Sequence, residues 1–397
     1  MKVNYGLSVH GKNELKAVCD VIKKSTQMGK NTKLFEKKIS KLFQKKYGLM
    51  VNSGSSALLL AYEILPIPKG SNIITPVLTF ATTVSSMIKS GFVPNFVDVD
   101  LRTYCIDENE IEKSINKKTK AISVPNLLGN LPNWVLIKKI AKKYNLLIIE
   151  DSADALGSKI NNFSSGRFSD ISITSFYGSH IINCAGNGGY IGFNNKKFYE
   201  KAKLLRSWGR SSSLYDEFSE KIENRFNITI DKIRYDKKFV FEDLGYNFEP
   251  SEIGAAFGLV QLKKLNYNLK RRTNVFNQHN QFFSNFGDFF ITPIQKNNVT
   301  TGWLAYPLLV KKNQYFNRTE LQIFLEKNKI QTRVVFTGNI LRQPGFKRIK
   351  CIKKLKYINA DKIMKASLLI GCHHGLSSSQ ILYIQNTIKK FIKFKTK

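Results

Sequence analysis

Residues 169–193 read SDISITSFYGSHIINCAGNGGYIGF, and this stretch decides the fold. ISITSF predicts a strand, GNGG is typical of a tight turn, and YIGF predicts a strand that returns along the first. Ser175 ends the first strand, and His180 follows it in the loop before the turn. We therefore expect a hydroxyl and an imidazole close to one end of a sheet.

An upstream stretch, NSGSSALLLAYEIL (52–65), predicts an anion site. Gly54 permits a tight turn, Ser55 follows it, and an apolar helix begins there. The N-terminus of a helix presents free N–H groups, and these bind phosphate-like groups well. An ordinary capped helix without a ligand is the alternative interpretation.

A third stretch, IIEDSADALGS (148–158), brings acid to the same region. A hydrophobic strand delivers Asp151 to its carboxyl end, and Asp154 follows three residues later. A carboxylate in this place can keep a pyridinium nitrogen protonated, which makes the ring an electron sink. A helix cap or a metal ligand are the alternatives.

Between about residues 45 and 195, short apolar runs alternate with longer helical ones. The predicted strands are 72–76, 94–100, 120–129 and 146–151, and the predicted helices are 79–91 and 132–145. This alternation predicts an α/β domain with a largely parallel sheet, in which ligands lie at the carboxyl ends of the strands. A helix over 251–270 leads into a smaller α+β part. We expect a large domain over 1–270 and a small C-terminal domain over 271–397.

Composition excludes several classes of protein. The chain has 397 residues with 63 Lys+Arg against 29 Asp+Glu, a formal charge of +34. Such a charge suits a nucleic-acid binder, but the basic residues are spread along the chain and no nucleic-acid motif accompanies them, so a lysine-rich composition is the better interpretation. No apolar run approaches the ~18 residues of a membrane span, and no secretory signal opens the chain. Five scattered cysteines predict neither a disulfide framework nor a metal site. We expect a soluble cytoplasmic protein without a nucleic-acid or membrane partner.

Three more segments complete a pattern that resembles a known family. They are RSWGR (206–210), LGYNFEPSEIGAAFG (244–258) and TRVVFTGNILRQPGF (332–346). With the three clusters above, in this order and spacing, they resemble the DegT/DnrJ/EryC1 sugar aminotransferase family from about residue 25 to 375. The resemblance implies the type I fold of PLP-dependent transferases, similar to aspartate aminotransferase.

His180 occupies the position at which this family has the lysine that binds PLP covalently. Imidazole cannot form that stable link, so the cofactor must be held by other contacts, most usefully as PMP. The change resembles the branch of PMP-dependent 3-dehydratases that act on nucleotide-linked 4-keto-6-deoxyhexoses for O-antigen lipopolysaccharide. It implies C3 deoxygenation, of GDP-4-keto-6-deoxymannose in the first instance, with His180 as catalytic acid and base. The CDP-4-keto-6-deoxyglucose reaction, nucleotide-sugar aminotransfer and a retired active site are the alternatives.

The iron–sulfur members of this branch carry cysteines after the WGR and ED segments. This chain instead has Ser211, Ser212 and Ser213 after the first and Ser152 and Ala153 after the second. Four thiolate ligands cannot be assembled from these positions. We therefore expect no iron–sulfur cluster, and glutamate as the amino donor that regenerates PMP.

The resemblance also implies roles for particular residues. Gly54, Ser55 and Ser175 would bind the cofactor phosphate. Phe80 would cover the pyridine ring, although a core position in the 79–91 helix is nearly as consistent with the sequence. Further residues fall into four implied roles: Asp151 and Asp154 beside the ring, Asn247 reaching the phosphate of a neighbouring subunit in a homodimer, Arg206 and Arg210 on phosphate or diphosphate groups, and Arg333, Asn339 and Arg342 on the sugar nucleotide.

Overall fold

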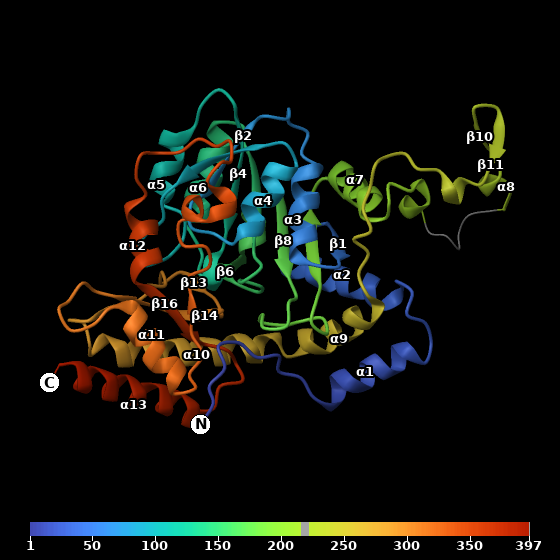
Figure 1. Cartoon of the computed structure of the whole chain (residues 1–397). Coiled ribbons are helices and arrows are strands. Elements are labelled where there is room, and N and C mark those ends of the chain that lie inside the picture. Colours follow the sequence, from blue (N-terminus) through green and yellow to red (C-terminus); the bar gives the residue numbers. More distant parts are fainter. Residues whose placement is uncertain (216–221, 397) are drawn as a thin grey trace.

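A mixed sheet lies at the centre of the computed structural model, which describes residues 1–215 and 222–396 (Figure 1). In spatial order the strands of this sheet are β1 (Tyr47–Val51), β9 (Gly189–Phe193), β8 (Ile171–Ser175), β5 (Leu147–Asp151), β4 (Thr119–Pro125), β2 (Asn72–Pro76) and β3 (Val93–Val97). β9 runs antiparallel to both β1 and β8, whereas the strands from β8 to β3 pair in parallel. The largely parallel sheet that the sequence predicted is confirmed.

Helices cover both faces of this sheet, which explains why its strands are almost wholly buried. The helices of this part of the chain are α2 (Lys30–Leu42), α3 (Gly54–Glu63), α4 (Ala81–Lys89), α5 (Glu108–Ile111), α6 (Trp134–Lys143) and α7 (Lys196–Arg206). Within β5, Ile149 packs into a core shared with α3 and α7, while Ile148 packs on the opposite face against α6. Both isoleucines are fully buried.

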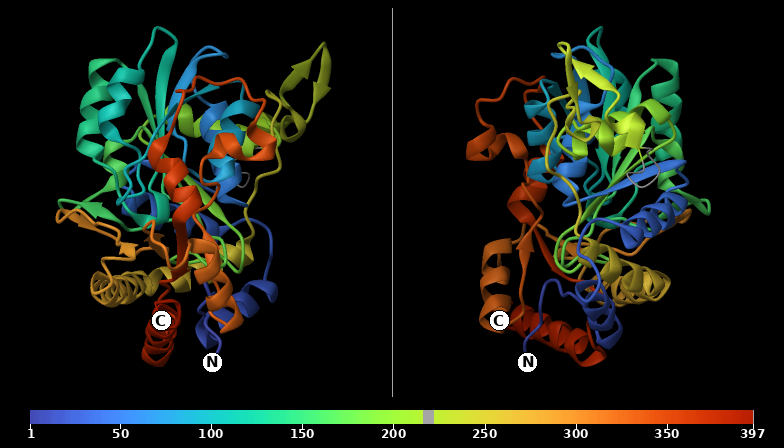
Figure 2. Two further views of the ribbon diagram at one scale, coloured as in Figure 1. Left: turned by 60° about the vertical axis from the view of Figure 1, so that its left-hand side comes forward. Right: turned by 90° about the vertical axis from the view of Figure 1, so that its right-hand side faces the viewer.

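A second lobe is built on a smaller antiparallel sheet. Its strands in spatial order are β12 (Phe290–Ile291), β14 (Ala305–Val310), β16 (Ser367–Gly371) and β15 (Arg333–Val334), and its helices are α11 (Arg318–Lys327), α12 (Ile358–Ala366) and α13 (Ser378–Lys395). Both chain termini lie on this lobe (Figures 1 and 2). Val3 forms a parallel bridge with Ile330, so the start of the chain belongs to the second lobe in space.

Two consecutive helices connect the lobes. α9 (Glu252–Lys263) packs against α1 (Lys12–Ile22), and α10 (Leu265–Ser284) continues from it into the second lobe. The single helix predicted over 251–270 is therefore two helices that meet at Lys264. Residue 270, the predicted end of the large domain, lies inside α10, so no linker marks that position.

The remaining elements are short. They are β6 (Lys159–Ile160), β7 (Phe163–Ser164) and β13 (Val299–Thr300), which form a three-stranded sheet, and α8 (Ile222–Arg225), β10 (Ile228–Ile230) and β11 (Ile233–Tyr235). The β10–β11 hairpin stands away from the body of the protein in Figure 1. Across the residues that the structure describes, no helix is both long and apolar enough to cross a membrane.

Several predicted strands are shorter in the structure because the backbone turns earlier than the apolar pattern does. The strand predicted over 120–129 ends at Pro125, and Leu128 adopts a left-handed conformation with φ of 59°. The strand predicted over 94–100 ends at Val97. These early turns release the chain at the carboxyl edge of the sheet, where the predicted site residues lie.

Candidate functional site

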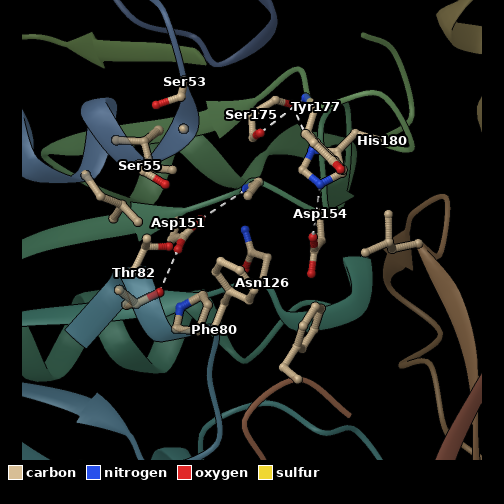
Figure 3. A pocket seen from close by; sticks show the side chains of 18 of the residues that line it. Ser53, Ser55, Phe80, Thr82, Asn126, Asp151, Asp154, Ser175, Tyr177 and His180 are labelled. Atoms are coloured by element: carbon tan, nitrogen blue, oxygen red, sulfur yellow. Dashed lines mark hydrogen bonds and ion pairs between the residues drawn. The ribbon is translucent and has the colours of Figure 1, made fainter. Parts of the chain in front are cut away.

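A cavity of about 370 Å³ opens at the carboxyl ends of β5 and β8, beside the N-terminus of α3 (Figure 3). It lies at the edge of the parallel strands where α/β proteins bind their ligands. Seven of the predicted site residues line it: Gly54, Ser55, Phe80, Asp151, Asp154, Ser175 and His180. Residues more than a hundred positions apart in sequence thus meet in one place.

The N-terminus of α3 forms one wall of the cavity. Ser53 caps the helix, since its Oγ accepts a hydrogen bond from the backbone N–H of Ser56 at 3.1 Å. The N–H groups of Gly54 and Ser55 have no carbonyl inside the helix to bond, so they can donate to an anion. A Cβ on Gly54 would lie 2.7 Å from the Cβ of Ser175, so glycine is what allows the helix to approach this hydroxyl.

Asp151 forms the floor of the cavity at the end of β5. Its Oδ2 accepts a hydrogen bond from the Thr83 hydroxyl at 3.0 Å, and its Oδ1 accepts one from the Ala153 N–H at 3.1 Å. Burial raises the pKa of this carboxyl to about 6 in spite of both bonds. A buried carboxylate facing a cavity in this way is suited to a cationic ring nitrogen.

His180 and Asp154 are neighbours in the lining of the cavity, with 3.9 Å between Nε2 of the imidazole and Oδ1 of the carboxylate. Nδ1 of His180 lies 3.1 Å from the carbonyl oxygen of Ser175, an acceptor, so Nδ1 carries the proton. The lone pair of a neutral His180 is therefore on Nε2, toward Asp154. Burial lowers the pKa of His180 to about 4, and burial together with the charge of Asp151 raises that of Asp154 to about 7.

Phe80 precedes α4, and 54% of its surface is exposed, so it is not part of the core. Its ring meets that of Phe336 edge-on with centroids 5.9 Å apart, and both line the cavity. The alternative of a core aromatic is therefore wrong, and the pair offers an apolar surface for a planar ring.

These residues fit PLP or PMP. The α3 N-terminus and Ser175 match a phosphate, Asp151 matches the pyridine nitrogen, and Phe80 matches the ring. The lining, as far as the structure describes it, includes no lysine that could attach the cofactor covalently and no arginine. Hydroxyl and backbone donors of this chain would therefore have to hold the phosphate.

Comparison with known proteins decides the family. The DegT/DnrJ/EryC1/StrS aminotransferase family matches residues 9–389. The chain belongs to this family. It is thus an enzyme of a PLP-dependent class, as the resemblance implied.

Two relatives are similar to this chain over nearly its whole length. The lipopolysaccharide biosynthesis protein RfbH of Salmonella typhimurium is 34% identical over 373 residues, covering 91% of this chain and 85% of RfbH. The GDP-4-keto-6-deoxy-D-mannose 3-dehydratase of Escherichia coli O55:H7 is 30% identical, covering 98% of this chain and all of the relative.

Solved structures confirm the predicted type I fold. An E. coli GDP-4-keto-6-deoxy-D-mannose 3-dehydratase with bound hydrated PLP superposes with a TM-score of 0.86 and 28% identity, covering 98% of this chain and 100% of its own. A second structure of a GDP-4-keto-6-deoxymannose 3-dehydratase contains a trapped PLP-glutamate geminal diamine. It superposes with a TM-score of 0.87 and 28% identity, covering 97% of this chain and 100% of its own. Helicobacter pylori PseC, an aminotransferase of pseudaminic acid biosynthesis, superposes equally well at 0.87, with 27% identity and coverage of 99% and 100%.

Four of the remaining predicted residues lie outside the lining but have evident partners. The buried Arg206 donates through Nη1 to Glu36 and to the carbonyl of Met50, both at 2.9 Å. Asn339 and Arg342 both donate to Asp361. Arg210 stacks over Trp208.

The last two predicted residues, Arg333 and Asn247, also lie outside the lining. The guanidinium of Arg333 stacks over Tyr5, whose ring lines the cavity, so Arg333 lies at the rim. Asn247 is exposed, and its backbone pairs with that of Ser207. Substrate contacts for the outlying residues remain predictions.

Sequence analysis missed many residues at the site, among them Tyr5, Asn126 and Arg272. Tyr5 and Asn126 line the cavity, and Arg272 of α10 binds the loop that carries His180. A tyrosine near the N-terminus and an arginine within a basic helix carry no local signal of such roles. Their positions depend on the docking of the second lobe.

Asp151→Asn tests the proposed contact with the ring nitrogen. A protonated ring beside Asp151 keeps the carboxyl ionised, so binding displaces a proton below about pH 6, and cofactor affinity should rise with pH up to that value and then level off. In Asp151→Asn the dissociation constant of PMP should increase roughly 10- to 100-fold. The rise of affinity with pH should also disappear in this variant. Titration of PMP fluorescence between pH 5 and 8 measures both.

The matched control for this titration is Asp100→Asn, which removes an exposed carboxylate elsewhere on the surface. It should retain the wild-type affinity and its pH step. An unchanged decline of affinity at acid pH in Asp151→Asn would contradict the assignment.

Proposed function

We propose that this protein is a PMP-dependent 3-dehydratase of a nucleotide-linked 4-keto-6-deoxyhexose. The substrate we infer is GDP-4-keto-6-deoxymannose, and the product is the corresponding 4-keto-3,6-dideoxy sugar. The observation that carries the proposal is His180, a histidine with a free Nε2 lone pair at the position of the family's lysine. The GDP-4-keto-6-deoxy-D-mannose 3-dehydratase of E. coli, which is similar to this chain over its whole length, supports the choice of substrate.

PMP supplies a primary amine that condenses with the C4 ketone of the sugar and a ring that accepts electron density. Asp151 would hold the ring nitrogen protonated so that it can do so. Nε2 of His180 would remove a proton from the C4′ carbon of the cofactor. The hydroxyl at C3 of the sugar, next to the activated C4 carbon, can then leave.

His180 would also protonate the departing hydroxyl. Hydroxide is a poor leaving group and needs an acid. Because burial lowers the pKa of His180, its protonated form is a stronger acid than an ordinary histidine and donates more readily. Asp154, 3.9 Å away, would stabilise the transient imidazolium.

Glutamate would restore PMP in a second half-reaction. In the first, the sugar would lose its C3 oxygen, and the amine that PMP supplies would be released as ammonia, which leaves PLP. In the second, glutamate gives up its amino group and leaves as 2-oxoglutarate. No external reductant is required, which agrees with Ser211, Ser212 and Ser213 after the WGR segment, where the iron–sulfur members of the branch have cysteines. We therefore infer an enzyme without an iron–sulfur cluster.

A homodimer with shared sites belongs to the same proposal. The lining of one chain has no described cation for a cofactor phosphate or a substrate diphosphate. Asn247, exposed and outside the cavity of its own chain, would reach the phosphate in the neighbouring subunit.

The mass of the sugar product tests the function. With PLP, glutamate and GDP-4-keto-6-deoxymannose, we expect a product lighter than the substrate by one oxygen, and no reaction of CDP-4-keto-6-deoxyglucose. A reaction of the CDP sugar alone would reassign the nucleotide. Replacement of the keto oxygen by an amine would mean aminotransfer, the activity of relatives such as PseC, and would contradict the proposal.

His180→Lys tests the residue itself. Lysine restores the amine that binds PLP covalently, so the variant should form an adduct that borohydride reduces and mass spectrometry detects on the protein. It should also lose 3-deoxygenation, since the lysine amine is then engaged by the cofactor. Wild-type deoxygenation by this variant would exclude His180 as the acid–base group, and wild-type protein treated identically is the control.

A further inference from the structure

Arg272 is a fully buried arginine that makes no contact with a carboxylate at hydrogen-bond distance among the described residues. It lies on α10, and its side chain points to the loop of His180 from behind the cavity. Burying a charge without an ionised partner is costly unless neutral groups satisfy all its donors. The acceptors around Arg272 therefore have to compensate for the cost of burying its charge.

All five N–H groups of Arg272 have an acceptor. Nη2 donates to the carbonyls of Ser179 and His180, at 3.3 Å each. Nη1 donates to the carbonyls of Trp303 and Leu304, at 3.0 Å each, and Nε donates to Nδ1 of His374 at 3.3 Å. Three segments thus meet on one guanidinium: the loop of His180, the residues before β14 and those after β16.

The contact with the backbone of His180 complements the bond at its ring. Nδ1 is fixed by the Ser175 carbonyl, and the main chain of His180 is fixed by Arg272. Together these bonds determine where Nε2 points. The planar five-donor fork of arginine fits this arrangement, and the three donors of a lysine ammonium cannot reproduce it.

Arg272 also places a positive charge in the protein interior, away from water. Burial lowers its pKa only to about 10, so it remains a cation at neutral pH. Its positive charge disfavours a second cation at His180 and favours the ionised form of Asp154. The other titratable groups around His180 are Asp154, Asp151, Tyr177 and Tyr5, which line the cavity with it, while Cys372, His373 and His374 lie beside Arg272.

We propose that Arg272 is a positioning residue for His180: it fixes the loop that carries the imidazole, and its charge adds to the burial that keeps this imidazole neutral and able to accept a proton. The catalytic consequence rests on the proposed function. The effect on His180 does not, because it can be observed without turnover.

The test is a histidine titration by NMR on ¹⁵N-histidine-labelled full-length protein. The chain has five histidines, and His180→Asn assigns the signal of interest by its loss. In Arg272→Gln the charge is removed, and the pKa of His180 should rise by about one unit. In Arg272→Lys the charge remains, so the pKa should stay within about half a unit of wild type while Nδ1 and Nε2 signals broaden or shift as the loop loosens.

Arg271→Gln is the matched control. It removes the same charge from the adjacent position, where the side chain donates to the Leu376 carbonyl and does not contact the His180 loop. It should leave the His180 titration unchanged. If turnover is measured, the acid-side limb of the pH–rate profile should move with the pKa in Arg272→Gln and remain fixed in the control.

Two results would overturn the proposal. One is an unshifted His180 pKa in a folded Arg272→Gln protein, which would reduce Arg272 to a structural role. The other is a His180 pKa that rises as much in Arg271→Gln as in Arg272→Gln, which would show that the effect does not depend on the contact between Arg272 and the His180 loop.

Discussion

The site depends on one close approach between backbone elements, that of the N-terminus of α3 to strands β8 and β9. A Cβ on Gly189 would lie 2.2 Å from the carbonyl oxygen of Ser53, and one on Gly54 would lie 2.7 Å from the Cβ of Ser175. Only glycine at both positions permits the contact. It brings the free N–H groups of the helix beside the Ser175 hydroxyl, and the chain that leaves Ser175 reaches His180 five residues later.

Around this contact the protein holds ionisable groups away from water. Glu150, one residue before Asp151, is fully buried but accepts hydrogen bonds from Asn126, Ser152, Ser169 and Ser172. Asp151 accepts two and faces the cavity, so it retains capacity for a ligand. The two neighbouring carboxylates therefore differ: that of Glu150 is bound within the protein, and that of Asp151 faces the cavity. They differ because a strand directs alternate side chains to opposite faces. Burial raises the pKa values of Asp151 and Asp154, which disfavours the ionised folded state, a cost that active sites commonly carry.

Local patterns in the sequence predicted much of this arrangement. Apolar strands that end in polar residues gave the sheet, and the residues that those ends carry, Asp151 and Ser175, do meet in the cavity. What the sequence did not contain was long-range geometry. Arg272 lies 92 positions after His180, and its role arises only because α10 packs behind the active-site loop. Arg206 is a second example of long-range geometry. Its place in the RSWGR segment predicted a contact with phosphate, whereas in the structure its guanidinium binds Glu36 of α2.

A histidine in place of the family's lysine should change the fate of the cofactor's nitrogen. A single turnover with ¹⁵N-labelled PMP, the GDP-linked 4-keto sugar and no glutamate measures that fate directly. We expect one labelled ammonia and one PLP for each sugar deoxygenated, with no label in the sugar. Label recovered as an amino group on the sugar would contradict it.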